Sequence, residues 1–130
     1  MEAYKVLILG GNRFVGKLLA KSLLSLNIEV TVFNRKGTGL EGCNIIKGDR
    51  KNLEDLKQID FNSFDCIVDM CLYNPKQFKL IEPLLNKNIN YVFISSGAAY
   101  EDPDIWPIDE NNFLLGIEAY GNYGVEKAEV

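Results

Sequence analysis

The 130-residue sequence predicts an α/β fold built on a doubly wound parallel sheet of about five strands with flanking helices. Short apolar segments alternate along the chain with segments in which apolar residues recur at helical spacing. Strands joined by helical crossovers pair in parallel through right-handed connections. The composition is 47% hydrophobic and 25% charged, which is typical of one globular domain and excludes disordered and fibrous proteins.

Five segments are expected to form the strands. Residues 4–9 are almost all apolar or aromatic and stop at two glycines, as a buried strand does. Residues 29–33 are rich in β-branched side chains. The other three predicted strands are residues 43–46, 64–70 and 91–95.

Two helices are expected in the first half of the chain. Apolar residues at helical spacing predict the first from Phe14 to near Asn27. Leu53 and Leu56 indicate a short second helix, for which Asn52 is the expected N-terminal cap.

The second half has clear start and stop signals. Asn74 followed by Pro75 is typical of a helix start, and that helix should break or kink at Pro83, which has no amide hydrogen. Residues 96–113 are rich in Gly, Pro and Asp and predict a long loop. Residues 118–130 are expected to form the last helix.

Charge and cysteine content restrict the partners. With 14 basic and 18 acidic residues and no histidine, the net charge is −4, so we expect no nucleic-acid partner. A zinc site would need Cys43, Cys66 and Cys71 together with a carboxylate, so no metal is expected and the thiols are predicted to be reduced. The apolar run ending at Leu9 is too short for a signal peptide or membrane span, which predicts a cytoplasmic protein without a membrane partner.

A glycine-rich turn lies between the first strand and the first helix. Glycines permit a tight turn and close approach of a pyrophosphate, while the start of a helix offers free N–H groups and a positive dipole. The second strand ends about 20 residues later, where a ribose contact is expected. An ordinary strand–helix turn is the alternative to a dinucleotide site here. The predicted cofactor contacts are Gly10, Gly11, Asn12, Arg13, Phe14 and Gly16.

This turn resembles that of the extended and atypical short-chain dehydrogenase/reductases, also called the NAD-dependent epimerase/dehydratase family. Their T-G-x-x-G-x-x-G pattern is matched at Gly10 and Gly16, with Leu9 and Arg13 as departures that are similar to a G-G-x-R-F-x-G subgroup. The resemblance covers essentially the whole chain and implies a Rossmann-fold NAD(P)-binding domain over residues 1–130. Because the family's proteins are more than twice this length, we expect an N-terminal fragment whose C-terminal part is missing.

The end of the second predicted strand bears on the choice of cofactor. NAD-binding proteins of this fold place an acidic residue there, which accepts hydrogen bonds from the ribose hydroxyls. This chain has Asn34, Arg35 and Lys36 instead, and an arginine can bind a 2′-phosphate through two charge-assisted bonds. Arg13 could reach the same place. We therefore favour NADP over NAD, with solvated turn cations as the alternative.

Two further segments resemble cofactor-binding parts of the family. Gly48-Asp49-Arg50 is similar to the family's G-D-x-x-D segment, whose aspartate accepts a bond from adenine. Cys71 and Leu72 stand where the family has small residues against the cofactor ribose. The resemblance thus implies cofactor contacts at Asp49, Arg50 and Cys71, although a solvated turn carboxylate is an alternative for Asp49.

A candidate catalytic set lies near the carboxyl end. Tyr123 and Lys127 are four residues apart on a predicted helix, so both lie on one face. A nearby ammonium favours the phenolate form, which suits a proton acid or base beside hydride transfer. Ser96 ends a segment that resembles the family's Ser-Ser-x-x-Val-Tyr strand, which implies that it hydrogen-bonds a substrate oxygen. Simple helix-face aromatics at Tyr120 and Tyr123 are the alternative.

These features predict an NAD(P)-dependent oxidoreductase, epimerase or dehydratase that acts on a sugar nucleotide or a small carbonyl or hydroxyl substrate. A non-catalytic NAD(P)-binding regulatory module is one alternative. An RNA-associated protein is another, because chloroplast stem-loop-binding relatives have a similar glycine turn. Five strands without a continuation leave an apolar sheet edge uncovered, so association into a homo-oligomer is also expected.

Overall fold

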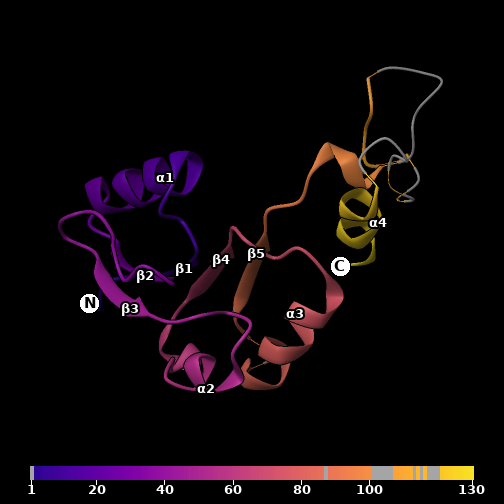
Figure 1. The fold of residues 1–130 in the computed structure, drawn as a ribbon. Helices are drawn as coiled ribbons and strands as arrows, with labels where there is room; N and C mark the ends of the chain where they lie inside the picture. The colour runs from indigo at the N-terminus through magenta and orange to yellow at the C-terminus, as the bar shows by residue number, and fades with distance from the viewer. Residues whose placement is uncertain (1, 87, 101–106, 113, 115, 117–120) are drawn as a thin grey trace. The chain divides into compact units, whose positions relative to one another are not determined.

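The computed structural model describes residues 2–86, 88–100, 107–112, 114, 116 and 121–130 (Figure 1). The chain divides into two compact units, each of which is described separately below. The first unit comprises Met1–Leu72 and Leu80–Ile94, and the second comprises Tyr73–Lys79 and Ser95–Val130.

The first unit is built on a five-stranded parallel sheet, which confirms the predicted fold class. Because the strand order reverses beside β1, the carboxyl ends of β1 and β4 form the switch point at which open α/β sheets bind ligands. The predicted ranges 64–70 and 91–95 extended beyond the strands that form. Across the sheet the order is β3 (Asn44–Lys47), β2 (Glu29–Asn34), β1 (Lys5–Leu9), β4 (Cys66–Asp69) and β5 (Asn90–Phe93).

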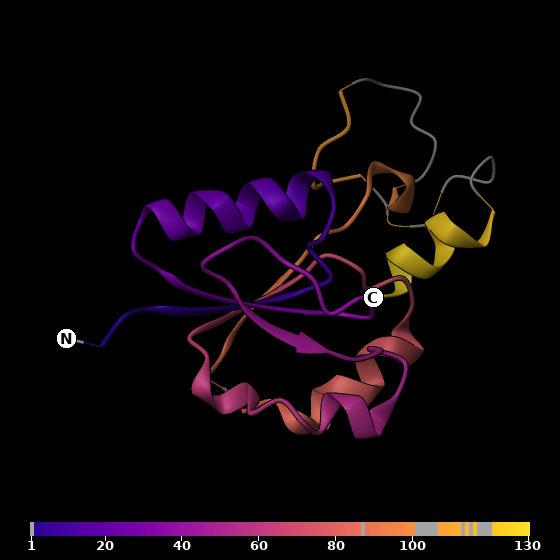
Figure 2. The same ribbon diagram turned by 60° about the vertical axis from the view of Figure 1, so that its left-hand side comes forward.

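Helices cover both faces of this sheet (Figure 2). Helix α1 (Phe14–Ser25) lies on one face, and the short α2 (Leu53–Leu56) and the 3₁₀-helix Phe61–Ser63 lie on the other. The expected cap of α2 is confirmed, because the side chain of Asn52 accepts a hydrogen bond from the amide of Glu54 at 2.9 Å. A helix on each face is the arrangement that parallel strands require, since both of their faces are apolar.

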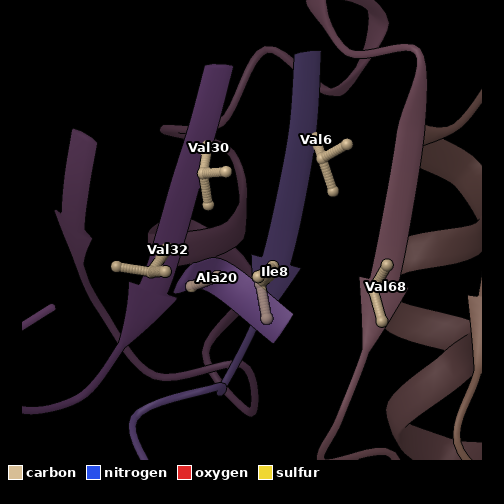
Figure 3. Packing of buried hydrophobic residues seen from close by; sticks show 6 residues of the cluster. All are labelled: Val6, Ile8, Ala20, Val30, Val32 and Val68. Carbon is tan, nitrogen blue, oxygen red and sulfur yellow. The ribbon is translucent and has the colours of Figure 1, made fainter. Parts of the chain in front are cut away.

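The core on the α1 face comes from every second residue of the central strands (Figure 3). Side chains alternate between faces along a strand, so the residues registered beside one another share a face. On the opposite face the sheet buries Leu7, Leu9, Phe33 and Ile67. The cluster packed against Ala20 of α1 consists of Val6, Ile8, Val30, Val32 and Val68.

Strand β5 is one of the two edge strands of the sheet and is less well covered than the central strands. Val92, which is registered with Val68, is 44% exposed. An exposed apolar residue on an edge strand favours pairing with another molecule. The homo-oligomer expected from the sequence stays a prediction.

Helix α3 (Pro75–Ile81) begins after Asn74 and ends before Pro83, as expected. The side chain of Asn74 accepts a bond from the amide of Gln77 at 3.1 Å, at the start of the helix. The helix then gives way to the 3₁₀-helix Glu82–Leu84, which contains Pro83, so the predicted break is confirmed.

In the second unit, α4 (Asn122–Glu129) packs on the 3₁₀-helix η3 (Gly97–Ala99). The helix expected over 118–130 begins at Asn122, directly after Gly121, whose φ of 56° is incompatible with a right-handed helix. Residues 101–106 and 113 of the predicted loop and residues 118–120 of the predicted helix lie outside the described residues. In the described part of the chain, every helix is too short or too polar to cross a bilayer.

We predict that Gly16→Ala destabilises the first unit. A Cβ on Gly16 would lie 2.2 Å from the Cα of Gly11, a backbone atom that can move only if the turn rearranges. The expected loss in free energy of unfolding is about 1–3 kcal/mol or more, measured by urea unfolding.

Gly97→Ala is the matched control, because a Cβ there meets nothing within 4 Å. This variant should stay within about 0.5 kcal/mol of the parent. Equal stability of the two variants would show that the turn does not depend on the close approach.

Candidate cofactor and catalytic sites

The glycine turn after β1 requires glycine at three positions. Gly10 and Gly11 have φ values of 88° and 72°, in the left-handed region that other residues rarely adopt. The amide of Gly10 donates to the carbonyl of Phe33 at 2.8 Å, which ties the turn to the end of β2. Gly16 is buried against Gly11, so helix α1 starts directly against the turn. A Cβ at Gly11 would lie 2.5 Å from Cγ2 of Ile8, and a Cβ at Gly16 would lie 2.2 Å from the Cα of Gly11, so neither position has room for a side chain.

The start of α1 is suited to an anion. Arg13 occupies the N-cap position, and its side chain makes no capping bond. The first turn of α1 contains no acidic residue, so the positive end of the helix dipole is not neutralised there. Arg13 is exposed, as is Phe14 at 81%. Free amides beside a glycine cradle fit the pyrophosphate of a dinucleotide.

The turn after β2 is held by its own side chains. Oδ1 of Asn34 accepts bonds from the amides of Gly37 and Thr38 at 2.8 and 3.2 Å, and its Nδ2 donates to the Thr38 carbonyl at 2.7 Å. Asn12 of the glycine turn donates to Oγ1 of Thr38 at 2.7 Å. Both asparagine side chains therefore shape the two turns, and exposed Arg35 supplies the positive charge at this place.

The loop after β3 holds Asp49 in a fixed orientation. Oδ1 of Asp49 accepts a bond from the Lys51 amide at 2.9 Å, and the Asp49 amide donates to Asp55 of α2 at 2.8 Å. Oδ2 of Asp49 has no protein partner among the described residues, so one carboxylate oxygen can accept a further bond. An adenine contact at Asp49 stays a prediction that this geometry permits.

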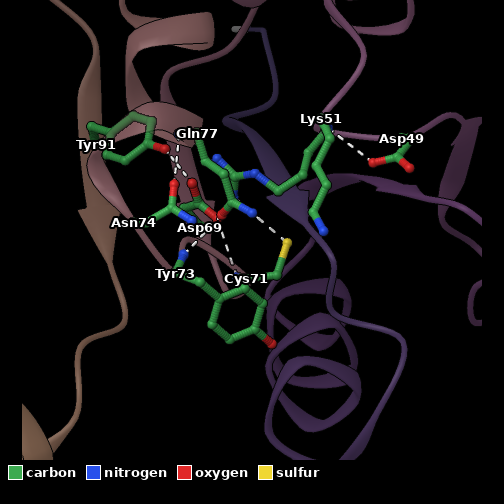
Figure 4. Close-up of polar contacts among 9 residues, drawn as sticks. Asp49, Lys51, Asp69, Cys71, Tyr73, Asn74, Gln77 and Tyr91 are labelled. Atoms are coloured by element: carbon green, nitrogen blue, oxygen red, sulfur yellow. Dashed lines mark hydrogen bonds and ion pairs between the residues drawn. The ribbon is translucent and has the colours of Figure 1, made fainter. Parts of the chain in front are cut away.

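A buried polar network lies at the end of β4 (Figure 4). Arg50, which is 7% exposed, forms an ion pair with fully buried Asp69. Asp69 also accepts bonds from the Tyr91 hydroxyl and, at 3.2 Å, from the Cys71 amide. Nη1 of Arg50 contacts the Cys71 sulfur at 3.6 Å. A cofactor contact by Arg50 stays a prediction, whereas its ion pair is what the structure shows.

The network raises the pKa values of Arg50 and Tyr91. Burial acts to lower the pKa of Arg50, but the adjacent Asp69 carboxylate outweighs it and raises that pKa above its usual value. Burial, followed by the charge of Asp69, raises the pKa of the Tyr91 phenol. Arg50 is thus a permanent cation and Tyr91 a permanent hydroxyl donor, and the carboxylate between them is satisfied by both.

Cys71 joins this network to the glycine turn. A Cβ built on Gly10 would lie 3.1 Å from the Cys71 sulfur, so the thiol packs directly against the first glycine. The family's smaller residue at this place would leave that space open, whereas this chain fills it with sulfur. Cys71 therefore supports the turn, and a ribose contact by this residue stays a prediction.

In the second unit, Tyr123 and Lys127 lie on one face of α4, as their spacing predicts. The Lys127 ammonium is 5.9 Å from the centre of the Tyr123 ring. Lys127 is only 5% exposed, whereas Tyr123 is 42% exposed and accessible to a ligand. Ser96 caps η3, on which α4 packs, and its Oγ accepts a bond from the Ala98 amide at 3.2 Å.

Several residues of these sites were not predicted from the sequence. Asp69 and Tyr91 resemble ordinary strand residues, and Thr38 is one of several small polar residues in a turn. Tyr73, whose ring lies 5.1 Å from the Lys127 ammonium, follows an apolar segment without any motif. An aspartate inside an apolar strand is the one signal that was available, because a buried charge needs a partner.

Comparison with known proteins assigns the chain to a family. The sequence model of the NAD dependent epimerase/dehydratase family matches residues 6–74, more than half of the chain. The chain belongs to this family. The match includes the glycine turn, Asp49, Arg50 and Cys71, so the part of the chain that holds the predicted cofactor contacts is the part that defines membership.

Solved structures of epimerases have the same fold. The UDP-Glc/GlcNAc 4-epimerase from Campylobacter jejuni matches with a TM-score of 0.82 at 20% identity, over 98% of this chain and 46% of that one. The Bordetella bronchiseptica enzyme WbmG in complex with NAD and UDP matches with a TM-score of 0.74 at 18% identity, over 98% and 48%. These neighbours show the fold, and family membership supports a nucleotide-binding domain.

A curated relative is similar in sequence. Chloroplast stem-loop binding protein of 41 kDa b from Arabidopsis thaliana is 29% identical over 123 residues, which cover 79% of this chain and 32% of that protein. The chain thus spans about a third of this relative's length and less than half of the length of the two solved structures.

We predict that Arg50→Met lowers the free energy of unfolding by about 3–5 kcal/mol, because it leaves a buried carboxylate without its cation. Urea unfolding measures the loss. Lys57→Met is the matched control, since its ion pair with Glu54 is 51% and 78% exposed and should contribute about 0–1 kcal/mol.

Arg50→Met combined with Asp69→Leu should recover part of the loss, because no uncompensated charge then remains in the interior. A cost for Arg50→Met no greater than that for Lys57→Met would mean that the buried pair does not stabilise the fold.

Proposed function

We propose that this chain is the cofactor-binding part of an NAD(P)-dependent enzyme that transfers hydride to or from a sugar nucleotide or a small carbonyl or hydroxyl compound. The observation that carries the proposal is the contact of Gly16 with Gly11 at the uncapped start of α1. A turn this close brings the start of α1, where the first backbone amides have no acceptor within the helix, directly beside the glycine turn. Family membership supports the same assignment.

Residues of the first unit would hold the cofactor. Amides at the start of α1 would bind the pyrophosphate, and Asp49, with one free oxygen, would accept a bond from the adenine amino group. Arg13 and Arg35 are exposed cations, and β2 ends in Asn34 rather than in an acidic residue, so NADP is the proposed cofactor rather than NAD.

Residues of the second unit would carry the proton chemistry. The bound nicotinamide supplies the hydride acceptor or donor. Tyr123 exchanges a proton between its hydroxyl and the substrate oxygen, and the Lys127 ammonium stabilises the phenolate that forms when this proton leaves. Ser96 orients the substrate oxygen by donating its hydroxyl hydrogen, while its Oγ lone pair remains bonded to the Ala98 amide.

Binding of a nucleic-acid stem-loop is a second candidate, favoured by the name of the Arabidopsis thaliana relative. The net charge of −4 opposes it, because phosphate backbones are bound by clustered cations. Fluorescence anisotropy with a labelled RNA stem-loop decides between the two. Binding that weakens steeply as salt rises would favour this candidate, whereas no binding at low salt would remove it.

A small molecule is therefore the proposed partner, and the cytoplasm is the proposed location. The name of the Arabidopsis thaliana relative places that protein in the chloroplast. Cell fractionation of the tagged natural protein tests the location.

We predict that Arg35→Ala weakens binding of NADPH by about 1.5–3 kcal/mol, the scale of a hydrogen bond to a charged group, and barely changes binding of NADH. Calorimetric titration of both cofactors measures the difference. Lys21→Ala removes an equally exposed charge from α1 and should change neither affinity. Equal losses for the two cofactors would exclude a contact between Arg35 and the 2′-phosphate.

We predict that Tyr123→Phe lowers turnover of the full-length protein by about a hundred- to ten-thousand-fold, because the phenyl ring cannot exchange a proton. Cofactor affinity should stay unchanged, since the ring and its packing remain. Tyr4→Phe, at a tyrosine of similar exposure (47%), is the control and should retain full activity. Retention of most turnover by Tyr123→Phe would favour the non-catalytic NAD(P)-binding module.

A further inference from the structure

In the second unit, the ring of Tyr73 lies closer to the Lys127 ammonium than the ring of Tyr123 does. The Lys127 nitrogen is 5.1 Å from the centre of the Tyr73 ring and 5.9 Å from that of Tyr123. Both distances are within the range in which a cation is attracted to the face of an aromatic ring. The two rings also contact each other, with centroids 6.4 Å apart and planes tilted by 50°.

The backbone of Tyr73 is fixed at the start of α3 (Figure 4). Its amide donates to Oε1 of Gln77 at 2.9 Å, and the Gln77 amide donates to Oδ1 of Asn74 at 3.1 Å. Gln77 is 6% exposed, and both of these hydrogen bonds are partly buried. The Tyr73 side chain is nevertheless 48% exposed, and its backbone is thus held in place although the ring contributes little to a core.

Lys127, unlike the exposed ring of Tyr73, is buried. It is 5% exposed, although its ammonium would gain most by facing water. An attraction to ring faces is stronger for a cation that has lost water than for an exposed one. Among the described residues, the rings of Tyr73 and Tyr123 thus offset part of the cost of burying this ammonium.

We propose that Tyr73 is a positioning residue that holds the Lys127 ammonium beside Tyr123. The ammonium is held by its attraction to the ring face of Tyr73, and the hydroxyl group of Tyr73 does not contribute. That this placement serves proton transfer rests on the proposed function. The placement itself concerns only this chain and can be measured without turnover.

The test is trace acetylation of the folded 130-residue chain, with the rate at Lys127 measured by mass spectrometry relative to exposed Lys17 of α1. Tyr73→Phe keeps the ring face and should leave the relative rate unchanged. Tyr73→Leu removes the ring and should raise the rate about 2- to 30-fold, the range of a cation–π contact from exposed to desolvated sites.

A third variant distinguishes steric shielding of the Lys127 ammonium from its attraction to the ring face. Pentafluorophenylalanine in place of Tyr73 keeps the size of the ring but reverses its quadrupole, so it should raise the rate as Tyr73→Leu does. Tyr4→Leu, at a tyrosine of equal exposure, should leave the rate unchanged. Because the fluorinated ring leaves no cavity, a higher rate in this variant cannot come from the space that Tyr73→Leu opens.

The proposal is overturned if Tyr73→Phe raises the rate as much as Tyr73→Leu, or if the fluorinated ring behaves like phenylalanine. It is also overturned if Tyr4→Leu has the same effect as Tyr73→Leu. A protein that binds no cofactor and transfers no hydride would still show the predicted order of rates. Failure of the proposed function is thereby distinguishable from failure of this inference.

Discussion

The ion pair between Arg50 and Asp69 links the loop that follows β3 to the end of β4. Arg50 comes from the loop after β3, at one edge of the sheet, and Asp69 ends β4 on the far side of β1. Tyr91 of β5 binds the same carboxylate, and Cys71 connects it to Gly10. Charges buried in this way are costly unless every one is paired, so the pair forces these loops into one arrangement. That requirement shapes the carboxyl edge of the sheet, the edge at which open α/β sheets bind ligands.

Sheet register explains why the network forms on one face. Ile67 and Asp69 point to the same face of β4, and Tyr91 is registered with Ile67, so its ring extends toward Asp69 as a diagonal neighbour. The core against α1 occupies the other face and is entirely apolar. Apolar packing thus holds the sheet to α1, while the polar network sets the loops.

The strands, α1 and the turn signals could be predicted from the sequence, because each depends on local periodicity or on single residues such as Asn52 and Pro83. The glycine turn was also predictable, since its spacing requires Gly10 and Gly16. Burial of Arg50 was not, because it depends on Asp69, which is 19 residues away. Its position after a Gly-Asp turn is typical of a solvated side chain. The place of Tyr73 beside Lys127 likewise follows from tertiary contacts that no local pattern encodes.

If the glycine turn holds the phosphates of a dinucleotide, the amide chemical shifts of its residues change when the dinucleotide binds. Titration of NADPH into the ¹⁵N-labelled chain, followed by two-dimensional NMR, should shift the amides of Gly10, Gly11 and Gly16 together, with saturation at one equivalent. Shifts at Asp49 should follow the same curve, because the adenine end binds in the same step. Saturation of the chain without any change at the three glycines, or no binding of NADPH or NADH at all, would contradict the account.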